Sequence, residues 1–590
     1  MFSQEAGQSP RVKLIEALEV LQRPVKDNAS QVKIFLAVGF MPLHLQTFLG
    51  AELRALFPEE RIDIEVGVFG DLCGSVERLK PFEMDSIAVV VEWSDLDARL
   101  GVRSLGGWRP EHLTDIVESA ARTKDRLERG LKALSERAPV VVCMPTLPLP
   151  PMFWTRPAQA GSAMLQLQLV VASLAESLSQ SNGLRIVNSQ LLNETSAPSE
   201  RYDLKSDVMT GFPYCLRHAS AVGKSLADLV RNPSPKKGLI TDLDDTLWAG
   251  IVGEDGVDGI SWDLNSHTHM HGLFQQVLAS LAGAGILVAV ASKNDPAIVD
   301  RAFERTDLLL TRASIFPLEI HWSRKSESVQ RILKTWNVSA DSVVFVDDNP
   351  MEIAEVKGAF PEMECILFPK NNYQGIWDLF KHLRVLFGKP CLTDEDTIRL
   401  HSVRESGAWR DIDLSSGSSS DDFLRASDAS VVFDSTQSWG DLRAFELINK
   451  TNQFNLNGKR FTETAWRAFF SEPAAFLLTV SYKDKFGPLG KIAAIVGKAH
   501  GRTLCVNSWV MSCRAFSRRI EHQCLKYLFE NFEVQEIAFD YEPTLRNGPL
   551  QTFFEELNGN TPTEGFTLSK GKFEANVPLL FHRVEGIVRV

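Results

Sequence analysis

The sequence lacks the cysteine spacing, the long apolar runs and the basic excess that would indicate several classes of protein. Its eight cysteines lie far apart and form no C-x-x-C pair, which disfavours a zinc knuckle or a disulfide framework. A net charge of −12 and a pI near 5.6 argue against nucleic acid or an anionic membrane as the main partner. We therefore expect a cytoplasmic protein with reduced thiols.

Signals for a membrane or for export are also missing. No run approaches the roughly 18 apolar residues that cross a bilayer, and residues 1–8 contain neither a basic region nor the apolar core of a secretory signal. A length of 590 residues with 44% hydrophobic residues predicts several globular domains.

The most informative stretch is Leu239-Ile-Thr-Asp242-Leu-Asp244-Asp245-Thr246, where an apolar run leads into two carboxylates two residues apart. If the run is a buried strand, Asp242 and Asp244 lie at its carboxyl end, where open α/β sheets bind their ligands. This indicates a Mg²⁺ site with a nucleophilic carboxylate. Taken alone, the pattern also fits an Asp-rich loop that caps a helix.

Three further segments follow in a defined order. A second apolar run ends at Ser292, a predicted helix carries Lys325, and a third apolar run leads into Asp347 and Asp348. Strand then Asp, strand then Ser, helix with Lys, strand then Asp-Asp resembles the four-part signature of the haloacid dehalogenase superfamily at every part.

That resemblance implies a role for each residue. Asp242 would attack phosphorus and become an aspartyl phosphate, and Asp244 would act as general acid and base. Ser292 would hydrogen-bond the transferring phosphoryl group, while Lys325 would balance its charge and anchor the carboxylates. Mg²⁺ is the implied cofactor, because it takes hard oxygen ligands and the acids would otherwise raise one another's pKa. The implied ligands are the Asp242 carboxylate, the Asp244 backbone carbonyl, Asp347 and, directly or through water, Asp348.

The spacing of these motifs leaves no room for a lid. The gaps of 50 residues from Asp242 to Ser292 and 33 residues from Ser292 to Lys325 are each nearly consumed by one crossover helix and its loops. An uncapped site is open to a substrate carried on another protein, although uncapped members that act on small molecules also exist.

Three domains are expected: 1–230, 231–390 and 391–590. Apolar runs alternate with helical spacing in the first domain, which indicates an α/β fold of its own. The prolines of 231–237 predict a linker. The first domain resembles an SGNH hydrolase but lacks a Gly-Asp-Ser nucleophile, so we expect no hydrolysis there. The third resembles the GNAT acyltransferase fold. The fold class is therefore α/β, with a central uncapped Rossmann-like haloacid dehalogenase domain flanked by an SGNH-like α/β domain and a GNAT-like α+β domain.

Periodicity places the individual elements. Predicted strands of the first domain are 32–40, 62–69, 86–91 and 139–143, and its predicted helices include 112–135 and 162–178. For the third domain the prediction is strands at 476–482, 491–496, 504–510 and 537–539 and a helix at 518–532. Glu92, Asp95, Asp97 and Arg99 follow a predicted strand. We interpret them as solvated helix-capping residues, with the lining of a cleft as the alternative.

The amino-acid sequence around the motifs resembles that of a narrower group, the FkbH-like proteins of polyketide biosynthesis. The residues that carry this resemblance are 242–256, 291–295, 325–327 and 345–350, together with Asn-Lys-Thr-Asn-Gln-Phe-Asn at 449–455. This resemblance implies conversion of 1,3-bisphosphoglycerate, or a similar phosphorylated acid, to a glyceryl thioester on the phosphopantetheine arm of an acyl carrier protein. The alternative is a Mg²⁺ phosphatase for a free small metabolite. Asp245 stands where the family commonly has Asn, and its charge either tightens metal binding or alters the repulsion of phosphate.

A thiol in the third domain is a candidate acyl relay. Cys513 lies between a predicted strand and helix, where a helix N-terminus lowers a thiol's pKa; a small buried residue is the alternative. Arg514 and Arg518 are expected to meet a cofactor phosphate or an acidic carrier surface, unless they lie on a solvated helix face. The usual CoA pose is disfavoured, because Ser517 and Arg519 replace the small residues that let phosphate approach the backbone.

Three alternating histidines precede a predicted helix. His267, His269 and His271 would lie on one side of an extended loop. No fourth ligand is nearby, so contact of His271 with substrate is favoured over a zinc site.

Overall fold

Three β-sheets, in two compact units, make up the described part of the chain. The computed structural model describes residues 13–26, 29–80, 83–393, 396, 398–404, 420–485, 487–512, 515–516, 518–560 and 562–588. One unit holds the described residues of Gln8–Pro233 and Phe461–Pro473, and the other those of Ser234–Arg460 and Ala474–Val590. In the described residues, no helix has the length and apolar character that crossing a membrane requires.

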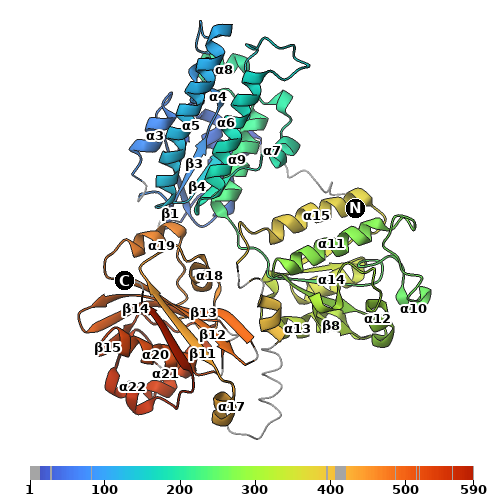
Figure 1. Ribbon diagram of the computed structural model, residues 1–590, viewed down its shortest axis with the longest axis vertical. Coiled ribbons are helices and arrows are strands. Elements are labelled where there is room, and N and C mark those ends of the chain that lie inside the picture. Colours follow the sequence, from blue (N-terminus) through green and yellow to red (C-terminus); the bar gives the residue numbers. More distant parts are fainter. Residues whose placement is uncertain are drawn as a thin grey trace. The chain divides into compact units, whose positions relative to one another are not determined.

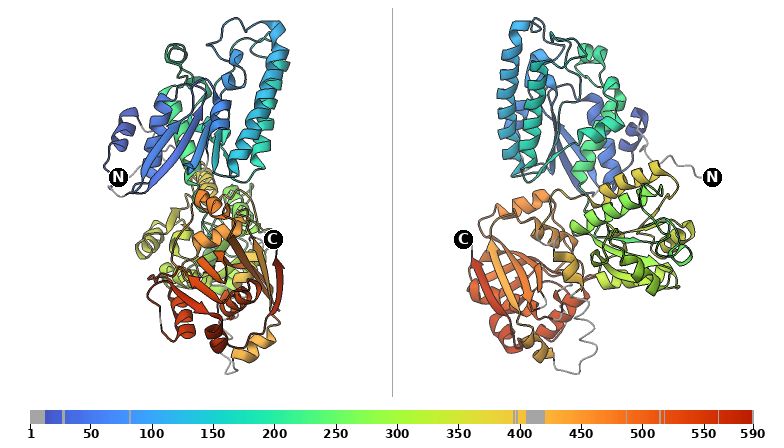
Figure 2. Two further views of the ribbon diagram at one scale, coloured as in Figure 1. Left: turned by 90° about the vertical axis from the view of Figure 1, so that its left-hand side faces the viewer. Right: turned by 45° about the vertical axis from the view of Figure 1, so that its right-hand side comes forward.

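The first sheet has five parallel strands in the order β2-β1-β3-β4-β5. These are β1 (Gln31–Val38), β2 (Arg61–Val66), β3 (Ser86–Val90), β4 (Val140–Cys143) and β5 (Leu184–Ile186). The helices of this unit include α1 (Leu14–Leu21), α2 (Leu43–Leu56), α3 (Leu72–Arg78), α4 (Trp93–Leu96), α5 (Leu113–Ser135), α6 (Ser162–Ser179), α7 (Ser189–Thr195), α8 (Leu204–Thr210), α9 (Leu216–Arg231) and α19 (Glu463–Phe470). Helices flank this sheet (Figures 1 and 2).

Alternation along the strands builds a core on each face. In β1, Phe35 and Ala37 pack with the buried residues of α3, α5 and α6, whereas Leu36 and Val38 pack with those of α1, α2 and α9. Successive side chains of a strand point to opposite faces, so a fully apolar strand needs helices on both sides.

The second sheet is also parallel, with the order β10-β9-β6-β7-β8. Its strands are β6 (Gly238–Thr241), β7 (Leu287–Ser292), β8 (Ile315–Ile320), β9 (Val343–Asp347) and β10 (Glu364–Leu367). The helices around it are α10 (Val252–Asp255), α11 (His269–Gly283), α12 (Pro296–Phe303), α13 (Lys325–Trp336), α14 (Pro350–Ala359) and α15 (Tyr373–Phe387). The chain runs from β6 to β7 on one side and later returns to β9 on the other, and ligands bind at such a switch point.

The segment between Asp242 and Lys325, where a lid domain would be inserted, contains none. Residues 242–325 are described throughout, and they hold the crossover helix α11, strands β7 and β8 of the central sheet and short helices, with no second sheet. Both faces are covered: α11, α12 and α15 pack on one, and α13 and α14 on the other.

The third sheet is mixed and seven-stranded, with the order β16-β15-β14-β13-β12-β11-β17. Its strands are β11 (Ser430–Thr436), β12 (Ala475–Asp484), β13 (Gly487–His500), β14 (Thr503–Met511), β15 (Glu536–Phe539), β16 (Phe566–Ser569) and β17 (Arg583–Val588). Helices α17 (Ser420–Ala426), α18 (Leu442–Lys450), α20 (Ile520–Asn531), α21 (Gly548–Asn558) and α22 (Lys570–Asn576) accompany it. Pairing of β14 with β15 and of β11 with β17 is parallel, and the rest is antiparallel.

Two expectations need correction. Helix α11 begins at His269, so His269 and His271 lie in a helix and do not alternate along an extended loop. Residues 461–473, which were expected in the third domain, belong to the N-terminal compact unit. There Arg467 is 5% exposed and donates to the Ser135 carbonyl, and Thr464 donates to the Asp85 carbonyl at 3.0 Å.

Candidate functional site

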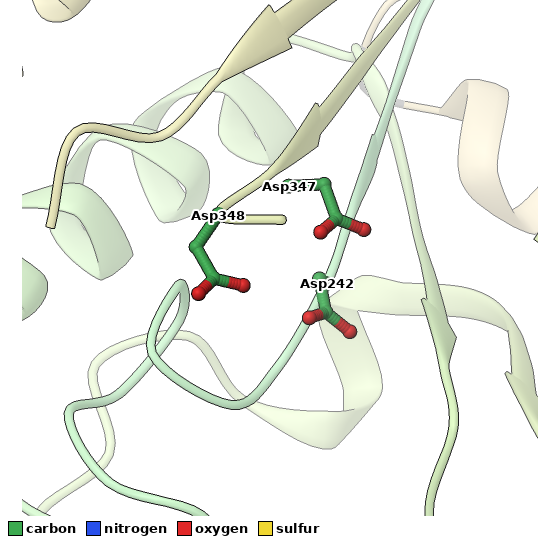
Figure 3. A group of neighbouring side chains, drawn as sticks. All are labelled: Asp242, Asp347 and Asp348. Atoms are coloured by element: carbon green, nitrogen blue, oxygen red, sulfur yellow. The ribbon is translucent and has the colours of Figure 1, made fainter. Parts of the chain in front are cut away.

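Three carboxylates meet at the carboxyl ends of two neighbouring strands. Asp242 follows β6 and Asp347 ends β9, which are paired so that Thr241 lies opposite Val346. Asp348 follows at once, and each of the three offers an oxygen within 4.8 Å of the others. Figure 3 shows the three side chains gathered beside the strand ends. Carboxylate oxygens are the donors that Mg²⁺ prefers.

Local sequence explains why the strands stop here. Asn349 caps α14 by accepting a hydrogen bond from the Met351 N–H at 2.9 Å, and Pro350 begins the helix. Asp295 and Pro296 do the same for α12, three residues after Ser292. Proline has no N–H to donate and suits the first position of a helix. A new helix therefore starts shortly after each strand, and the strand ends beside the functional side chain.

Lys325 joins two of the acids. It is the first residue of α13, and its buried Nζ lies 3.0 Å from Asp242 Oδ1 and 2.5 Å from Asp347 Oδ2. Both carboxylates hold the pKa of this lysine above its ordinary value, although burial opposes them. Lys325 therefore stays charged and fixes the two acids in place.

The carboxylates are electrostatically strained without a cation. Burial raises the pKa of Asp242, and burial together with the nearby charge of Asp242 raises that of Asp347 to about 7. The buried ammonium of Lys325 does not offset the cost of burying these acids. The donor set and its excess negative charge therefore fit a divalent cation.

Asp244 is placed apart from the three carboxylates. Its Oδ1 accepts from Trp248 Nε1 at 2.9 Å and from the Val252 N–H at 3.1 Å. Its Oδ2 accepts from Asn294 Nδ2 at 2.9 Å. Its side chain is not in the described three-carboxylate group, so ligation through its backbone carbonyl stays a prediction.

Asn294 is a site residue to which the sequence analysis gave no role. It is 3% exposed, and its Nδ2 also reaches Ser292 Oγ at 3.3 Å. The Ser292 side chain also acts on Asp242, since it lowers the pKa of that carboxyl against the larger effect of burial. Asn294 thus links the carboxyl of Asp244 to the hydroxyl beside Asp242. Its position two residues after Ser292 was the available signal.

Lys370 is a second residue that the sequence did not reveal. Its Nζ lies 2.6 Å from Asp245 Oδ2 and 2.9 Å from Asp348 Oδ2. Burial raises the pKa of Asp245, but Lys370 and the Gly250 N–H outweigh it and leave that pKa below its ordinary value. Asp245 is therefore an ionised carboxylate paired with a cation. No motif indicated this lysine, which is 125 residues from Asp245.

Thr246 connects the acidic cluster to α11. It is fully buried; its hydroxyl accepts from the Asp348 N–H at 3.1 Å, and its carbonyl lies 2.9 Å from His271 Nδ1. A carbonyl only accepts, so Nδ1 carries the proton. Burial lowers the pKa of His271, and its Nε2 is therefore an acceptor.

Of the site residues predicted in the third domain, the structure describes only Arg518. Cys513 and Arg514 lie outside the described residues. Arg518 is 3% exposed, with Nε 3.8 Å from Asp484 Oδ2 and its guanidinium 5.4 Å from the Tyr482 ring centroid. Binding of a phosphate by Arg518 stays a prediction, and its burial in this pair gives no support for it.

A segment of the same domain fills a gap in its sheet. Parallel pairing of β14 with β15 ends at Val506 and Phe539. Beyond that point Leu456 N–H donates to the Trp509 carbonyl at 2.9 Å, and Asn457 Nδ2 reaches the carbonyls of Asn507 and Asp540. An extended ligand that pairs with these strand edges would have to displace this segment.

A buried polar cluster lies in the N-terminal unit. Glu92 is 2% exposed and Asp95 is half-buried. The predicted capping is present, because the Asp95 carboxylate accepts from the Glu92 N–H at 2.8 Å at the start of α4, but the prediction that Glu92 is solvated was wrong. Thr146 Oγ1 donates to Glu92 Oε1 at 2.6 Å. His218 Nε2 contacts the same hydroxyl at 2.8 Å, and its Nδ1 lies 2.9 Å from Ser196 Oγ.

The direction of these bonds indicates a structural role. Since the Thr146 proton points to Glu92, His218 Nε2 donates to Thr146 and Nδ1 accepts from Ser196. Burial lowers the pKa of His218 to about 3. His218 thus has no free lone pair with which to take a proton from Thr146, and the absence of hydrolytic activity in this domain stays a prediction.

Comparisons with known proteins bear on the fold. No family model and no curated protein matches the sequence. Among solved structures, the chain is similar to the N-terminal part of the protein BF1531 from Bacteroides fragilis, which contains a phosphatase domain and was crystallised with Mg. The TM-score is 0.52 at 20% identity, and the match covers 64% of this chain and 100% of that one. The similarity shows a shared fold. The matched 64% of this chain is more than the second sheet and its helices contain, so the match includes further parts of the chain.

Proposed function

We propose that this chain is a Mg²⁺-dependent phosphatase of the haloacid dehalogenase type. The observation that carries the proposal is the meeting of Asp242, Asp347 and Asp348 with Lys325 at the switch point of the second sheet. The Mg-bound phosphatase domain in the structural neighbour supports it. Phosphoryl transfer is catalysed mainly by positioning and charge neutralisation, which this cluster supplies.

In the proposed reaction, an oxygen of Asp242 attacks phosphorus, and the bond to the leaving oxygen breaks. Asp244 gives a proton to that oxygen and later removes one from the water that hydrolyses the aspartyl phosphate. Ser292 hydrogen-bonds the transferring group, and Asn294 orients Asp244. Bound to Asp242, Asp347 and Asp348, Mg²⁺ would neutralise charge on the phosphoryl oxygens.

Hydrolysis of p-nitrophenyl phosphate tests this proposal. Activity should require Mg²⁺, and Asp242→Asn should lower kcat at least ~1,000-fold because it removes the nucleophile. Asp258→Asn is the matched control, since Asp258 is exposed in the same domain. After an acid quench, mass spectrometry should find phosphate on the peptide that contains Asp242. Full activity of Asp242→Asn would overturn the proposal.

A finer proposal concerns the product. On the resemblance to FkbH-like proteins, we propose that the substrate is 1,3-bisphosphoglycerate and that the glyceryl unit passes to the phosphopantetheine thiol of an acyl carrier protein. The thiol attacks the acyl carbon and displaces the acyl phosphate as inorganic phosphate, and the Asp242 site hydrolyses the remaining phosphate ester. The absence of an inserted lid between Asp242 and Lys325 favours it, because a carrier-borne group must reach the site.

Intact mass measurement of candidate carrier proteins separates the two functions. With enzyme, Mg²⁺ and 1,3-bisphosphoglycerate, a carrier should gain the mass of a glyceryl group, and Cys513→Ala should slow loading if that thiol is a relay. Normal loading by Cys513→Ala would remove the relay. Release of phosphate with no gain in mass would leave the phosphatase alone.

A further inference from the structure

Strand β17 borders the third sheet, and no described strand pairs with its outer side. Its partner is β11, to which it is parallel, and Figure 2 shows it at the margin of the sheet. Val584 is 44% exposed, and Arg583, Glu585 and Gly586 are exposed as well. The described part of the chain therefore leaves this strand uncovered.

An open strand edge is a template for pairing with another chain, and proteins block most such edges. The other edges of the three described sheets carry such a block. Strands β5, β10 and β16 have three or four residues, β8 contains Pro317, and β2 carries three charged side chains in six residues. Strand β17 has six residues, no proline, and two charges of opposite sign at Arg583 and Glu585. It is the described edge best suited to accept a further strand.

Alternate backbone groups of β17 point outward. Arg583 donates its N–H to the Ala429 carbonyl at 2.9 Å, so the odd-numbered residues of the strand turn their N–H and C=O groups to β11. The residues between them turn these groups to the opposite side. Val584 and Gly586 thus present donors and acceptors along the outer edge, where a second strand would pair with them.

The sequence of β17 is self-complementary in one antiparallel register. With Val584 opposite Val584 of a second copy, the outward backbone groups of the two residues face each other, and His582 lies opposite Gly586. The same register places Arg583 opposite Glu585 on both sides of the axis, and opposite charges that face one another across two strands stabilise their pairing. A shift that puts Glu585 on the axis would instead place two glutamates face to face.

The present partner of Arg583 does not oppose this pairing. Arg583 Nη2 lies 3.2 Å from Asp428 Oδ2, but the two side chains are 68% and 72% exposed. Ion pairs with such exposure contribute little to stability. Arg583 can therefore exchange Asp428 for Glu585 of a second copy at little cost.

We infer that β17 pairs with β17 of a second copy, antiparallel and about a two-fold axis at Val584, so that the two third sheets join into one continuous sheet. In such an interface each copy uses the same surface, which closes the assembly at two chains. This inference concerns the third sheet and is independent of the proposed phosphatase function.

Sedimentation equilibrium of the full chain tests the inference. Between about 0.1 and 100 µM, the measured mass should rise from that of one chain to that of two, because dimerisation follows mass action. The mass of a single chain throughout this range would overturn the inference.

Charge reversal tests the register. Arg583→Glu places two glutamates opposite one another on each side of the axis and should raise the dimer dissociation constant at least ~30-fold. Adding Glu585→Arg to this variant restores opposite charges and should return the constant to within about threefold of the wild type. Arg502→Glu makes the same change at an exposed arginine between β13 and β14 and should have no effect. Failure of the double variant to recover would overturn the inference.

A proline variant tests the backbone pairing. Val584→Pro removes an outward N–H that the strand's own sheet does not use, and edge strands tolerate proline at such positions. It should abolish the dimer at every concentration measured, and a dimer that persists would overturn the inference. Circular dichroism shows whether each variant is folded, and the charge variants decide the matter if Val584→Pro is not.

Discussion

Lys325 lies in hydrogen-bond contact with Asp347, with Nζ 2.5 Å from Oδ2, while its other carboxylate partner, Asp242, is 3.0 Å away. These three side chains come from α13, β9 and the end of β6. In the described structure the lysine is the cation that holds the proposed nucleophile against the proposed metal ligand.

Removing that cation should harm both stability and activity. In Lys325→Met, two buried carboxylates lose their partner, which costs about 3–5 kcal/mol when a buried pair is broken. Chemical unfolding without Mg²⁺ should show this loss, and added Mg²⁺ should restore part of it. Phosphatase kcat should fall ~100-fold or more. Lys334→Met, at an exposed position of the same helix, is the control, and equal behaviour of the two variants would contradict the assigned role.

Mg²⁺ should stabilise the folded protein by mass action. At a concentration 100 times its dissociation constant, a ligand that binds only the native state adds about 2.7 kcal/mol. Thermal unfolding with and without Mg²⁺ measures the effect. Asp347→Asn should remove most of the increase in Tm because it deletes a ligand, whereas Asp258→Asn should retain it. An increase that survives in Asp347→Asn would place the cation elsewhere.

Asp245 and Lys370 should influence Mg²⁺ affinity through each other. In Asp245→Asn, Lys370 keeps only Asp348 as a partner and competes with the cation for it, so the dissociation constant should rise about two- to fivefold, a modest change because Lys370 is 38% exposed. Lys370→Met should lower the dissociation constant. Calorimetric titration of both single variants and the double variant gives the coupling, and strictly additive effects would show that the pair does not act on the metal site.

His218 should make the N-terminal domain less stable in acid. Its pKa is lowered to about 3 from 6.5; between these values the unfolded chain binds more protons, so stability falls as pH drops below about 6.5, by up to ~1.4 kcal/mol per unit. Asp95, whose pKa is raised to about 7, acts in the opposite direction.

The comparison with His218→Gln isolates the histidine, because Asp95 is common to both proteins. Hydrogen exchange of the β3 and β4 amides at pH 7 and pH 5 measures their opening free energy. The wild type should lose more stability than the variant between these pH values. Identical losses would mean that His218 does not contribute.

The contact of α19 with the N-terminal unit should depend on Arg467. Arg467→Met leaves the Ser135 carbonyl without this donor, and an unsatisfied buried acceptor costs about 1–3 kcal/mol. Hydrogen exchange of residues 463–470 should accelerate accordingly. Arg502→Met, at an exposed arginine, should leave that exchange unchanged; acceleration in both variants would point to a nonspecific effect.

Much of the local structure could be predicted, because it depends on short-range patterns. The strand at 86–91 and the helix at 112–135 were expected within one residue of β3 and α5, since apolar runs and helical spacing are visible in the chain itself. The start of α11 was missed because no side chain caps its first turn, and the polar sequence there is typical of a loop.

Site residues could be predicted when their signal lay in the neighbouring sequence, and were missed when their partners lay far away in the chain. Asp242, Ser292 and Asp347 were found because each ends an apolar run, and strand ends are visible in sequence. Asn294 was given no role, although its position two residues after Ser292 was a usable signal. Lys370 had no such signal, because its partners Asp245 and Asp348 come from other loops and only the fold brings them together.

The sequence alone determined which side chains end the strands of the second sheet, since that depends on apolar runs and on the proline and asparagine that start the next helix. Only the tertiary structure decided which of these acids face one another, that a distant lysine neutralises Asp245, and that β17 borders the third sheet. Strand order and helix placement depend on packing between segments far apart in the chain, and packing of that kind leaves no local pattern.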